Sequence, residues 1–308
     1  MSSVPELPIV FFDHPVPDLY RDLTQGRMVA VGPQEGLEHA VGVIAGAKRA
    51  WNAAEFENAP QLKVLSRLGI GYDNVNVADA TAAGVTVCNA PVAPSVSTAE
   101  HTIALMLAVT KELVPQMDRA TAGLPGSGVG SSLELDGQTL GLVGFGRIAQ
   151  RVAVTGLSMG MNVLAHDPYL ETSPIDQVPL VSLEHLVSSS AVLSLHAPAT
   201  PETHHLVNAD VLSAMPAGSY LVNCARGALV DQDALIEALD RGHLAGAALD
   251  VTDPEPLPEG HPLLGRKDVI VTPHIASSTG AGRRRLYEHA IENVVAVLNG
   301  LPATIVTK

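Results

Sequence analysis

The sequence predicts an α/β protein built from two parallel sheets, each covered by helices on both faces. Short apolar runs rich in β-branched residues alternate with helical or turn segments along most of the chain. These runs lack the polar alternation of a sheet with one solvated face, which favours strands that are buried on both faces. The length of 308 residues also fits two domains better than one.

Five strands are expected in the first block of the chain, up to about residue 96. They are Ile9–Phe12, Met28–Val31, Val41–Ala45, Leu62–Arg67 and Val85–Cys88. Gly69, Ile70 and Gly71 follow the fourth strand, at the carboxyl edge where open α/β sheets bind ligands. A helix is expected to begin at residues 72–74.

The junction between the two blocks is expected to be a long helix. The segment Ser97–Glu100 reads S-T-A-E, a capping box in which the serine and glutamate side chains satisfy each other's backbone N–H groups. Pro115 is expected to kink or end this helix. The glycine- and serine-rich segment 123–132 then predicts a surface loop.

The second block resumes the alternation of strands and helices and supplies six further strands. They are Thr139–Val143, Val163–His166, Ala191–Leu195, Tyr220–Asn223, Ala245–Leu249 and Val269–Val271. Asn208 and Asp231 are expected to cap helices at their N-termini, and Gly242 is expected to follow a helix C-terminus.

An amphipathic helix is predicted after Gly280, with Leu286 and Ile291 on its apolar face. One helix that leaves the second block cannot add to a finished sheet, so we expect it to pack back on the first block. The predicted domains are therefore residues 1–100 with 283–308, and residues 101–282.

The turn that follows the first strand of the second block has the pattern G-x-G-x-x-A, typical of a dinucleotide site. Its first glycine makes the tight turn, its second lets the backbone approach a pyrophosphate, and Ala149 allows the helix to pack closely. The helix N-terminus offers free N–H groups to the phosphates. The predicted cofactor-binding residues of this turn are Gly144, Phe145, Gly146, Arg147 and Ile148.

Asp167 ends the next strand, 21 residues beyond Gly146. A carboxylate at this place can accept hydrogen bonds from both ribose hydroxyls, and its charge would repel a 2′-phosphate. Pro168 and Tyr169 supply no cation to offset that charge. The sequence therefore predicts NAD rather than NADP as the cofactor.

Further polar residues follow the other strands of the second block, at the edge where the cofactor is expected to lie. The predicted cofactor-binding residues there are His196, Ala197, Pro198, Cys224, Ala225, Asp250 and His274. Arg226 suits a carboxylate, which a guanidinium binds with two parallel hydrogen bonds. His274 can hold or release a proton near neutral pH, and Glu255 lies on a loop close enough in topology to orient it. Taken singly, each could instead be an ordinary surface or strand-end residue.

Composition excludes several other classes of protein. A net charge of −14 argues against a nucleic-acid partner, and no apolar run approaches the roughly 20 residues of a membrane span. Cys88 and Cys224 suggest no disulfide framework, and the N-terminus is unlike a signal peptide, so we expect a cytoplasmic protein. No His, Cys and Asp cluster has metal-ligand spacing. The basic run 283–285 is expected to be a solvated helix face rather than an anion site.

Several segments together resemble the D-2-hydroxyacid dehydrogenases over nearly the whole chain. They read S-R-L-G-I-G-Y-D-N-V (66–75), G-F-G-R-I-A (144–149), H-D-P-Y (166–169), V-N-C-A-R-G-A-L-V-D (222–231), A-A-L-D-V (247–251), D-P-E-P-L-P (253–258) and T-P-H-I-A-S-S-T (272–279). The resemblance implies a flavodoxin-like substrate domain, a Rossmann domain with NAD(P) in the cleft, and a homodimer joined through the cofactor domain.

The resemblance also implies roles for single residues. The family's catalytic Arg, Glu and His correspond to Arg226, Glu255 and His274, and an Asp beside the nicotinamide carboxamide corresponds to Asp250. Backbone N–H groups at two positions would help hold the substrate carboxylate. The predicted substrate-binding residues are Ile70, Gly71, Arg226, His274 and Ser277.

Departures from related families narrow the predicted substrate. Formate dehydrogenases have a glutamine where this chain has Glu255, which argues against formate. Phosphite dehydrogenases have a lysine where this chain has Ile70, which argues against phosphite. Phosphoglycerate dehydrogenases carry an arginine near Gly46, where this chain has no side chain, and often a C-terminal regulatory domain, which we do not expect here. These differences argue against a phosphorylated substrate. Such a substrate stays an alternative, because Lys48 and Arg49 are close to Gly46 and Arg67 keeps a matching arginine. A serine at position 277 is similar to the one in glyoxylate/hydroxypyruvate reductases. The tryptophan that the family commonly carries before the first strand of the cofactor domain is missing from residues 123–136.

Two functions are compatible with these features of the sequence. The first is an oxidoreductase that interconverts a small 2-oxo acid and its D-2-hydroxy acid with NAD(H). The second is an NAD(H)-sensing interaction protein like the C-terminal-binding co-repressors, which share the fold and the catalytic trio. The absence of a basic patch favours the enzyme.

Overall fold

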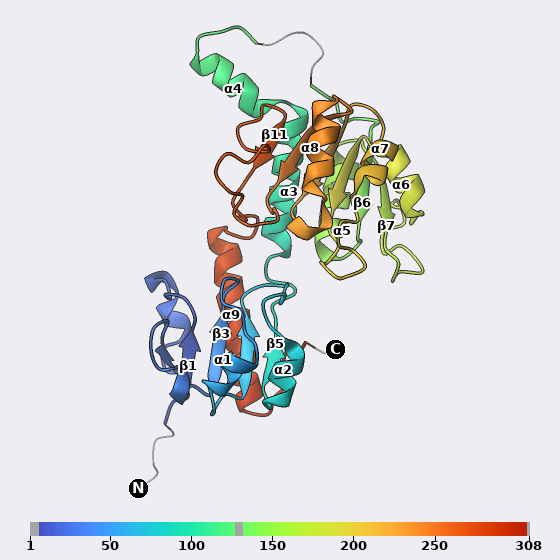
Figure 1. Ribbon diagram of the computed structural model, residues 1–308. Coiled ribbons are helices and arrows are strands. Elements are labelled where there is room, and N and C mark those ends of the chain that lie inside the picture. Colours follow the sequence, from blue (N-terminus) through green and yellow to red (C-terminus); the bar gives the residue numbers. More distant parts are fainter. Residues whose placement is uncertain (1–5, 127–131, 307–308) are drawn as a thin grey trace. The chain divides into compact units, whose positions relative to one another are not determined.

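The computed structural model describes residues 6–126 and 132–306 (Figure 1). The chain divides into two compact units, Met1–Ser95 with Ser278–Lys308 (unit 1) and Val96–Ser277 (unit 2). The predicted domain boundaries, after residues 100 and 282, each lie five residues later in the chain than those of the two units. Half of the surface loop predicted at 123–132 lies outside the described residues.

Unit 1 contains a five-stranded sheet in which every pair of neighbours is parallel. The strands are β1 (Ile9–Phe12), β2 (Val29–Val31), β3 (Gly42–Ala45), β4 (Val64–Arg67) and β5 (Thr86–Cys88). Their order in space is β2-β1-β3-β4-β5. This is the flavodoxin-like doubly wound order, so the predicted fold class is confirmed for this unit.

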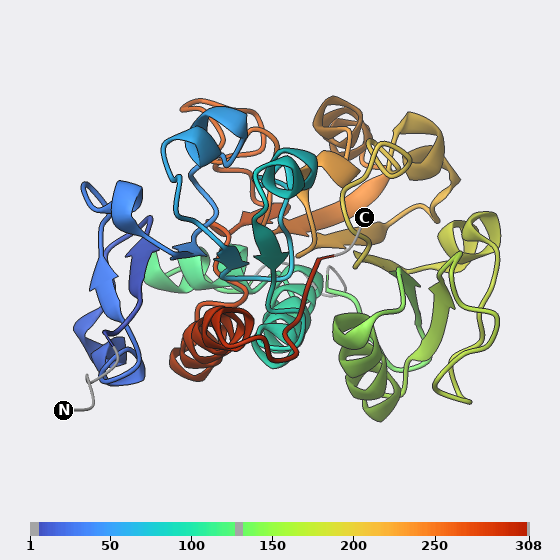
Figure 2. The ribbon, with the colours of Figure 1, turned by 90° about the horizontal axis from the view of Figure 1, so that it is seen from below.

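Helices cover both faces of this sheet (Figure 2). The helix α9 (Gly280–Leu298) packs on one face, where Tyr287, Ile291 and Val294 join a core with the strands. The helices α1 (Ala53–Glu57) and α2 (Val77–Ala82) cover the other face. The short 3₁₀ helices η1 (Asp18–Leu23) and η2 (Leu37–His39) complete the connections. The final helix thus returns to the first unit, as expected from the completed sheet of the second.

The segment after α9 covers the edge strand β5. Ile305 forms an antiparallel bridge with Cys88, and the Val306 N–H donates to the Val87 carbonyl at 2.8 Å. The N–H of Asn89, directly after β5, donates to the Thr304 carbonyl at 3.2 Å. This pairing uses edge groups that would otherwise be open to another strand.

Unit 2 contains a six-stranded parallel sheet in the order β11-β10-β9-β8-β6-β7. The strands are β6 (Thr139–Val143), β7 (Asn162–His166), β8 (Val192–Leu195), β9 (Ser219–Asn223), β10 (Leu244–Leu249) and β11 (Val269–Val271). Each predicted strand is present, within two residues of its expected bounds.

One further edge element was not predicted. Leu180 forms a parallel bridge with Ala165 beyond β7, supported by hydrogen bonds of Ala165 to Pro179 and Val181. If this bridge is counted as the third strand, the order becomes that of a Rossmann fold, 3-2-1-4-5-6, with β11 added. Its brevity explains why the sequence pattern missed it, because a single bridged residue leaves no periodic run.

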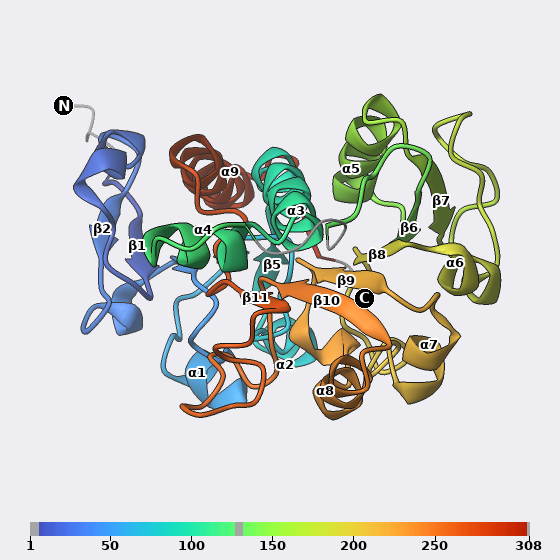
Figure 3. The same ribbon diagram turned by 90° about the horizontal axis from the view of Figure 1, so that it is seen from above.

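Helices also cover both faces of the sheet of unit 2 (Figure 3). The helices α3 (Ser95–Thr110) and α5 (Arg147–Ser158) pack on one face. The helices on the other face are α6 (Leu183–Ser189), α7 (Ala209–Ala214) and α8 (Gln232–Asp240), and the 3₁₀ helix η3 (Gly227–Leu229) lies just before α8 in the chain. The predicted caps are confirmed, since Asn208 and Asp231 accept backbone N–H bonds and Gly242 has a φ of 65°.

Three local expectations about helix ends were wrong. The helix α3 begins two residues before Ser97, directly after Pro94, so Ser97 lies inside the helix. It ends at Thr110, and Pro115 falls in the first turn of α4 (Leu113–Thr121), where its missing N–H costs nothing. The helix α2 begins at Val77, since the Asn76 side chain caps it, and not at residues 72–74.

Within residues 6–126 and 132–306, no helix combines the length and the hydropathy needed to cross a membrane. The same described residues contain no group of three or more His, Cys, Asp or Glu side chains arranged to hold a metal ion.

Candidate active site

The carboxyl edge of the sheet of unit 2 carries most of the predicted site residues. All six strands run parallel, so the residues that follow them share one edge. The residues that follow β6, β7, β8, β9, β10 and β11 are Gly144, Asp167, His196, Cys224, Asp250 and Thr272, respectively.

The glycine turn has the geometry that its pattern predicts. Gly144 has a φ of 85°, and a Cβ there would lie 2.9 Å from the Ala197 nitrogen, so a side chain would collide with the loop after β8. A Cβ at Gly146 would meet no protein atom within 4 Å. Gly146 precedes α5 without a side-chain cap, and the first N–H groups of the helix have no partner within it. These features leave space and donors for a phosphate group.

Asp167 is held beside this turn by two backbone donors. The Phe145 N–H donates to Oδ2 at 2.8 Å, and the Tyr169 N–H donates to Oδ1 at 3.0 Å. Each carboxylate oxygen accepts one bond and keeps further lone pairs for other donors. The residues of the turn therefore fit a dinucleotide, with the carboxylate fixed where ribose hydroxyls are expected.

His274 and Glu255 form a close pair of titratable groups at this edge. The distance between His274 Nδ1 and Glu255 Oε1 is 2.6 Å, and about 40% of each side chain is exposed (41% and 40%). The His274 backbone has a φ of 53°, a conformation that residues other than glycine rarely adopt. Its N–H donates to the Asp250 carbonyl at 2.8 Å. With Nδ1 on the carboxylate, Nε2 is the nitrogen free to exchange a proton with a ligand.

Asp250 organises the loop that carries His274. Its buried carboxylate accepts the N–H groups of Ile275 at 2.9 Å and Ala276 at 2.8 Å, and the Thr272 hydroxyl also donates to it. His101 Nε2 lies 3.3 Å from Oδ1. Asp250, which is expected to lie beside the nicotinamide, thus also holds the loop of His274 in place. Its contact with the cofactor stays a prediction.

Arg226 lies in a loop fixed by its neighbours. The Asn223 side chain donates to the Arg226 carbonyl at 2.8 Å and accepts the Ala225 N–H at 2.9 Å. A Cβ at Gly227 would lie 2.1 Å from the Thr252 carbonyl carbon, so only glycine lets these two loops meet. The loop at Thr252 leads to Glu255 three residues later. Close packing at Gly227 thus joins the loops that carry Arg226 and Glu255.

His196 and Cys224 have uncharged side chains at neutral pH. Burial lowers the pKa of His196 from 6.5 to about 4, and its Nε2 lies 3.0 Å from the Ser194 hydroxyl. Burial raises the pKa of Cys224 from 9.0 to about 12. Neither group therefore carries a charge or a reactive thiolate at this edge.

Three residues at this edge were not assigned from the sequence, namely His101, Asn223 and Thr272. No partner of His101 is visible in the sequence, because Asp250 lies 149 residues further along the chain and only the fold joins them. Asn223 and Thr272 stand inside the quoted segments 222–231 and 272–279, so their positions directly after buried strands could have identified them.

The predicted substrate-binding residues divide between the two units. Ile70 and Gly71 follow β4 at the carboxyl edge of the sheet of unit 1. Arg226, His274 and Ser277 belong to unit 2.

Residues 103–276 match the family model described as "D-isomer specific 2-hydroxyacid dehydrogenase, NAD binding domain". The chain belongs to this family. The match covers more than half of the chain and lies within unit 2, so the glycine turn and Asp167 belong to an NAD-binding domain.

Curated relatives include two kinds of oxidoreductase. The D-3-phosphoglycerate dehydrogenase of Archaeoglobus fulgidus is 40% identical over 254 residues, which cover 82% of this chain and 48% of that protein. The glyoxylate reductase of Thermofilum pendens is 38% identical over 269 residues, covering 83% of this chain and 78% of that protein. The chain thus spans about half the length of the phosphoglycerate dehydrogenases that it matches.

Solved structures agree with the fold over nearly the whole chain. The TT0316 protein of Thermus thermophilus is 41% identical with a TM-score of 0.87, covering 97% of this chain and 100% of that one. The D-lactate dehydrogenase of Aquifex aeolicus, solved with NAD and lactic acid, is 30% identical with a TM-score of 0.85, covering 95% and 96%.

The low pKa of His196 predicts a loss of stability in acid. The unfolded chain takes up a proton below about pH 6.5, whereas the folded chain does so only below about pH 4. The free energy of unfolding should therefore fall as pH decreases between these values, by at most about 3 kcal/mol from this group. Denaturant midpoints at pH 7.5 and pH 4.5 measure the fall.

The variant His196→Asn should lose part of this acid sensitivity. His39→Asn is a matched control, because 66% of the His39 side chain is exposed. An equal fall in the midpoints of His196→Asn and the unmodified chain would contradict the assignment.

Proposed function

We propose that the protein interconverts a small 2-oxo acid and its D-2-hydroxy acid with NAD(H). The observation that carries this proposal is the His274–Glu255 pair at 2.6 Å, on the same sheet edge as Arg226 and the NAD-binding turn. The cofactor, when bound, would supply a hydride as NADH in the reduction and would accept one as NAD⁺ in the oxidation. Reduction of the oxo carbon then needs one proton, which a histidine is suited to deliver.

In this proposal, Nε2 of protonated His274 donates a proton to the oxygen of the substrate as the C=O becomes C–OH. Glu255 contacts Nδ1 and thereby fixes the orientation of the ring, which leaves Nε2 for the substrate. Arg226 binds the substrate carboxylate with paired N–H bonds and polarises the oxo group. The backbone N–H groups of Ile70 and Gly71 also bind the carboxylate. In the oxidation, neutral His274 accepts the hydroxyl proton.

The environment of two arginines supports a substrate without a phosphate. Arg49 pairs with Glu55 and lies over the ring of Trp51, with 4.9 Å between the guanidinium carbon and the ring centroid. Arg67 is 9% exposed and donates to Asn74 Oδ1 and the Leu68 carbonyl. Both cations are engaged with other groups of unit 1, so a phosphate would have to compete with these partners.

A screen of NADH oxidation over glyoxylate, hydroxypyruvate, pyruvate, phenylpyruvate, 2-oxoisocaproate and phosphohydroxypyruvate tests the function and the substrate class. We expect turnover of an unphosphorylated acid. Preference for phosphohydroxypyruvate would refute the substrate class. NADH binding without turnover of any acid would instead favour the NAD(H)-sensing interaction protein.

The catalytic roles predict a graded loss of activity. His274→Gln removes the proton donor and should lower kcat by about 10²–10⁴-fold. Glu255→Gln keeps a hydrogen bond but removes the charge, so kcat should fall less in this variant than in His274→Gln. His185→Gln, an exposed histidine on α6, is the control. A kcat near the wild-type value in His274→Gln would exclude His274 as the proton donor.

Asp167 predicts a preference for NADH over NADPH. Replacement by alanine removes an acceptor for ribose hydroxyls and should lower kcat/KM with NADH by about tenfold or more. The ratio of kcat/KM for the two cofactors should move toward NADPH, since the charge that repels a 2′-phosphate is gone. The variant Asp176→Ala, at an exposed aspartate of unit 2, should leave the ratio unchanged. A wild-type preference for NADPH would overturn the assignment.

We also propose a homodimer that forms through unit 2. The helix α4 projects from the end of α3 (Figure 1), and it has no buried residue. Its side chains Leu113, Val114 and Met117 are 47%, 46% and 66% exposed. An apolar helix face of this kind is typical of a surface that another protein covers.

Light scattering should give a mass near twice the 32.0 kDa of one chain. The double variant Val114→Glu/Met117→Glu should shift the mass toward one chain, because burial of two carboxylates is costly. Val154→Glu on α5, where Val154 is 55% exposed, should remain dimeric. A wild-type monomer, or a dimer that survives the double change, would contradict the proposal.

A further inference from the structure

The loop after β4 is tied to the segment after β5 by two consecutive carbonyl groups. The Ala90 N–H donates to the Gly69 carbonyl at 2.8 Å. The Asn89 side chain donates through Nδ2 to the Ile70 carbonyl at 2.7 Å. The first tie is backbone to backbone and exists with any residue other than proline at position 90. The second depends on the side chain of Asn89.

These two ties fix the direction of the Ile70 and Gly71 N–H groups. Both peptide bonds are trans, so each N–H points away from the carbonyl in the same peptide plane. Because both carbonyls point to the segment after β5, both N–H groups point away from it. Neither N–H donates a hydrogen bond to a described residue of the chain. Two adjacent free N–H groups on one side form an anion-binding arrangement.

We propose that Asn89 is a positioning residue that holds the Ile70 and Gly71 N–H groups toward the substrate carboxylate. This inference rests on the proposed function of that loop. Without the Asn89 donor, the Ile70–Gly71 peptide plane keeps no tie on its carbonyl and is free to rotate. Rotation would turn the Gly71 N–H away from the carboxylate and bring the Ile70 carbonyl toward it.

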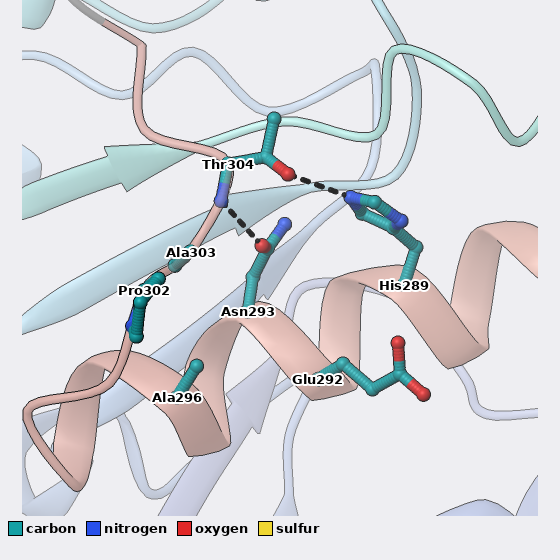
Figure 4. Close-up of a pocket in the computed structure, with 7 residues that line it drawn as sticks. All are labelled: His289, Glu292, Asn293, Ala296, Pro302, Ala303 and Thr304. Atoms are coloured by element: carbon teal, nitrogen blue, oxygen red, sulfur yellow. Dashed lines mark hydrogen bonds between the residues drawn. The ribbon is translucent and has the colours of Figure 1, made fainter.

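Asn89 is itself held from both sides by α9 and the C-terminal segment. Its carbonyl accepts Nδ2–H of Asn293 at 2.9 Å, and its N–H donates to the Thr304 carbonyl at 3.2 Å. Asn293 is 3% exposed, and its Oδ1 accepts the Thr304 N–H at 2.9 Å. His289 Nε2 lies 3.0 Å from the Thr304 hydroxyl. Figure 4 shows Asn293 and His289 on α9 facing Thr304 beside a surface pocket.

This arrangement gives the final helix a task beyond covering the sheet. One buried amide, Asn293, links α9, the C-terminal segment and the strand end at Asn89. The side chain of Asn89 then carries the constraint to the loop at Ile70. Every link lies within unit 1.

Kinetics of Asn89→Asp test the proposal, because a carboxylate cannot donate and would repel the Ile70 carbonyl. The substrates are pyruvate and methyl pyruvate, or the acid and methyl ester of whichever 2-oxo acid is turned over fastest. We expect KM for the acid to rise about tenfold or more, since a charge-assisted hydrogen bond is weakened. The ester should be affected much less, so the preference for acid over ester should collapse. Affinity for NADH should stay unchanged.

Asn299→Asp is the matched control, because Asn299 Nδ2 also donates to a backbone carbonyl at 2.7 Å, that of Val295 on α9. It should keep the wild-type preference for the acid. Asn89→Ala removes the donor without adding a charge, so it should also lower the preference for acid over ester, by a smaller factor than Asn89→Asp. This second variant decides the question if Asn89→Asp does not fold.

Hydrogen exchange of the chain without ligand gives a readout that does not depend on activity. Amides in residues 66–76 and 85–92 should exchange faster in Asn89→Asp and Asn89→Ala, because the bond from Ala90 to Gly69 is exposed when the loop loosens. Unchanged exchange, or an unchanged acid preference in an active variant, would overturn the role of Asn89. An inactive wild-type chain would instead refute the proposed function alone.

Discussion

Parallel alignment of the strands is the constraint on which the candidate site depends. Since neighbouring strands run in one direction, residues that follow different strands come to a single edge, although up to about 130 residues separate them in sequence. The NAD-binding turn, the loop of Arg226 and the loop of His274 meet in this way. Each unit repeats the principle, because Ile70 and Asn89 follow adjacent strands of the other sheet.

Strand ends alone would leave these loops mobile, and a polar side chain constrains each of them. Asp250 uses its carboxylate to gather the backbone of Ile275 and Ala276, which fixes His274 in a conformation that is unfavourable for a residue with a side chain. Asn89 holds the carbonyl of Ile70 in the other unit. The Asp250 carboxylate is buried, and a buried polar group is costly unless its hydrogen bonds are made, so its bonds both stabilise the loop of His274 and fix its geometry.

The sequence predicted the strands and the fold class accurately, since strands buried on both faces leave unbroken apolar runs. It also placed the glycine turn and Asp167, whose φ, open space and backbone donors agree with the pattern. The positions where helices start were predicted less accurately than the strands. Residues such as Ser97, Asn76 and Pro115 are each compatible with more than one position near a helix start. Leu180 left no signal at all, since one bridged residue has no period.

Local sequence by itself thus determined where each strand ends, which residues follow it and that the turn suits a dinucleotide. Only the tertiary structure decided which of those residues touch one another. The pairs His274–Glu255 and Asn89–Ile70 each join positions 19 residues apart, and the pair His101–Asp250 joins positions 149 residues apart. Their contacts arise from packing of whole strands and helices, and no spacing in the sequence encodes a distance between elements that the fold must first bring together.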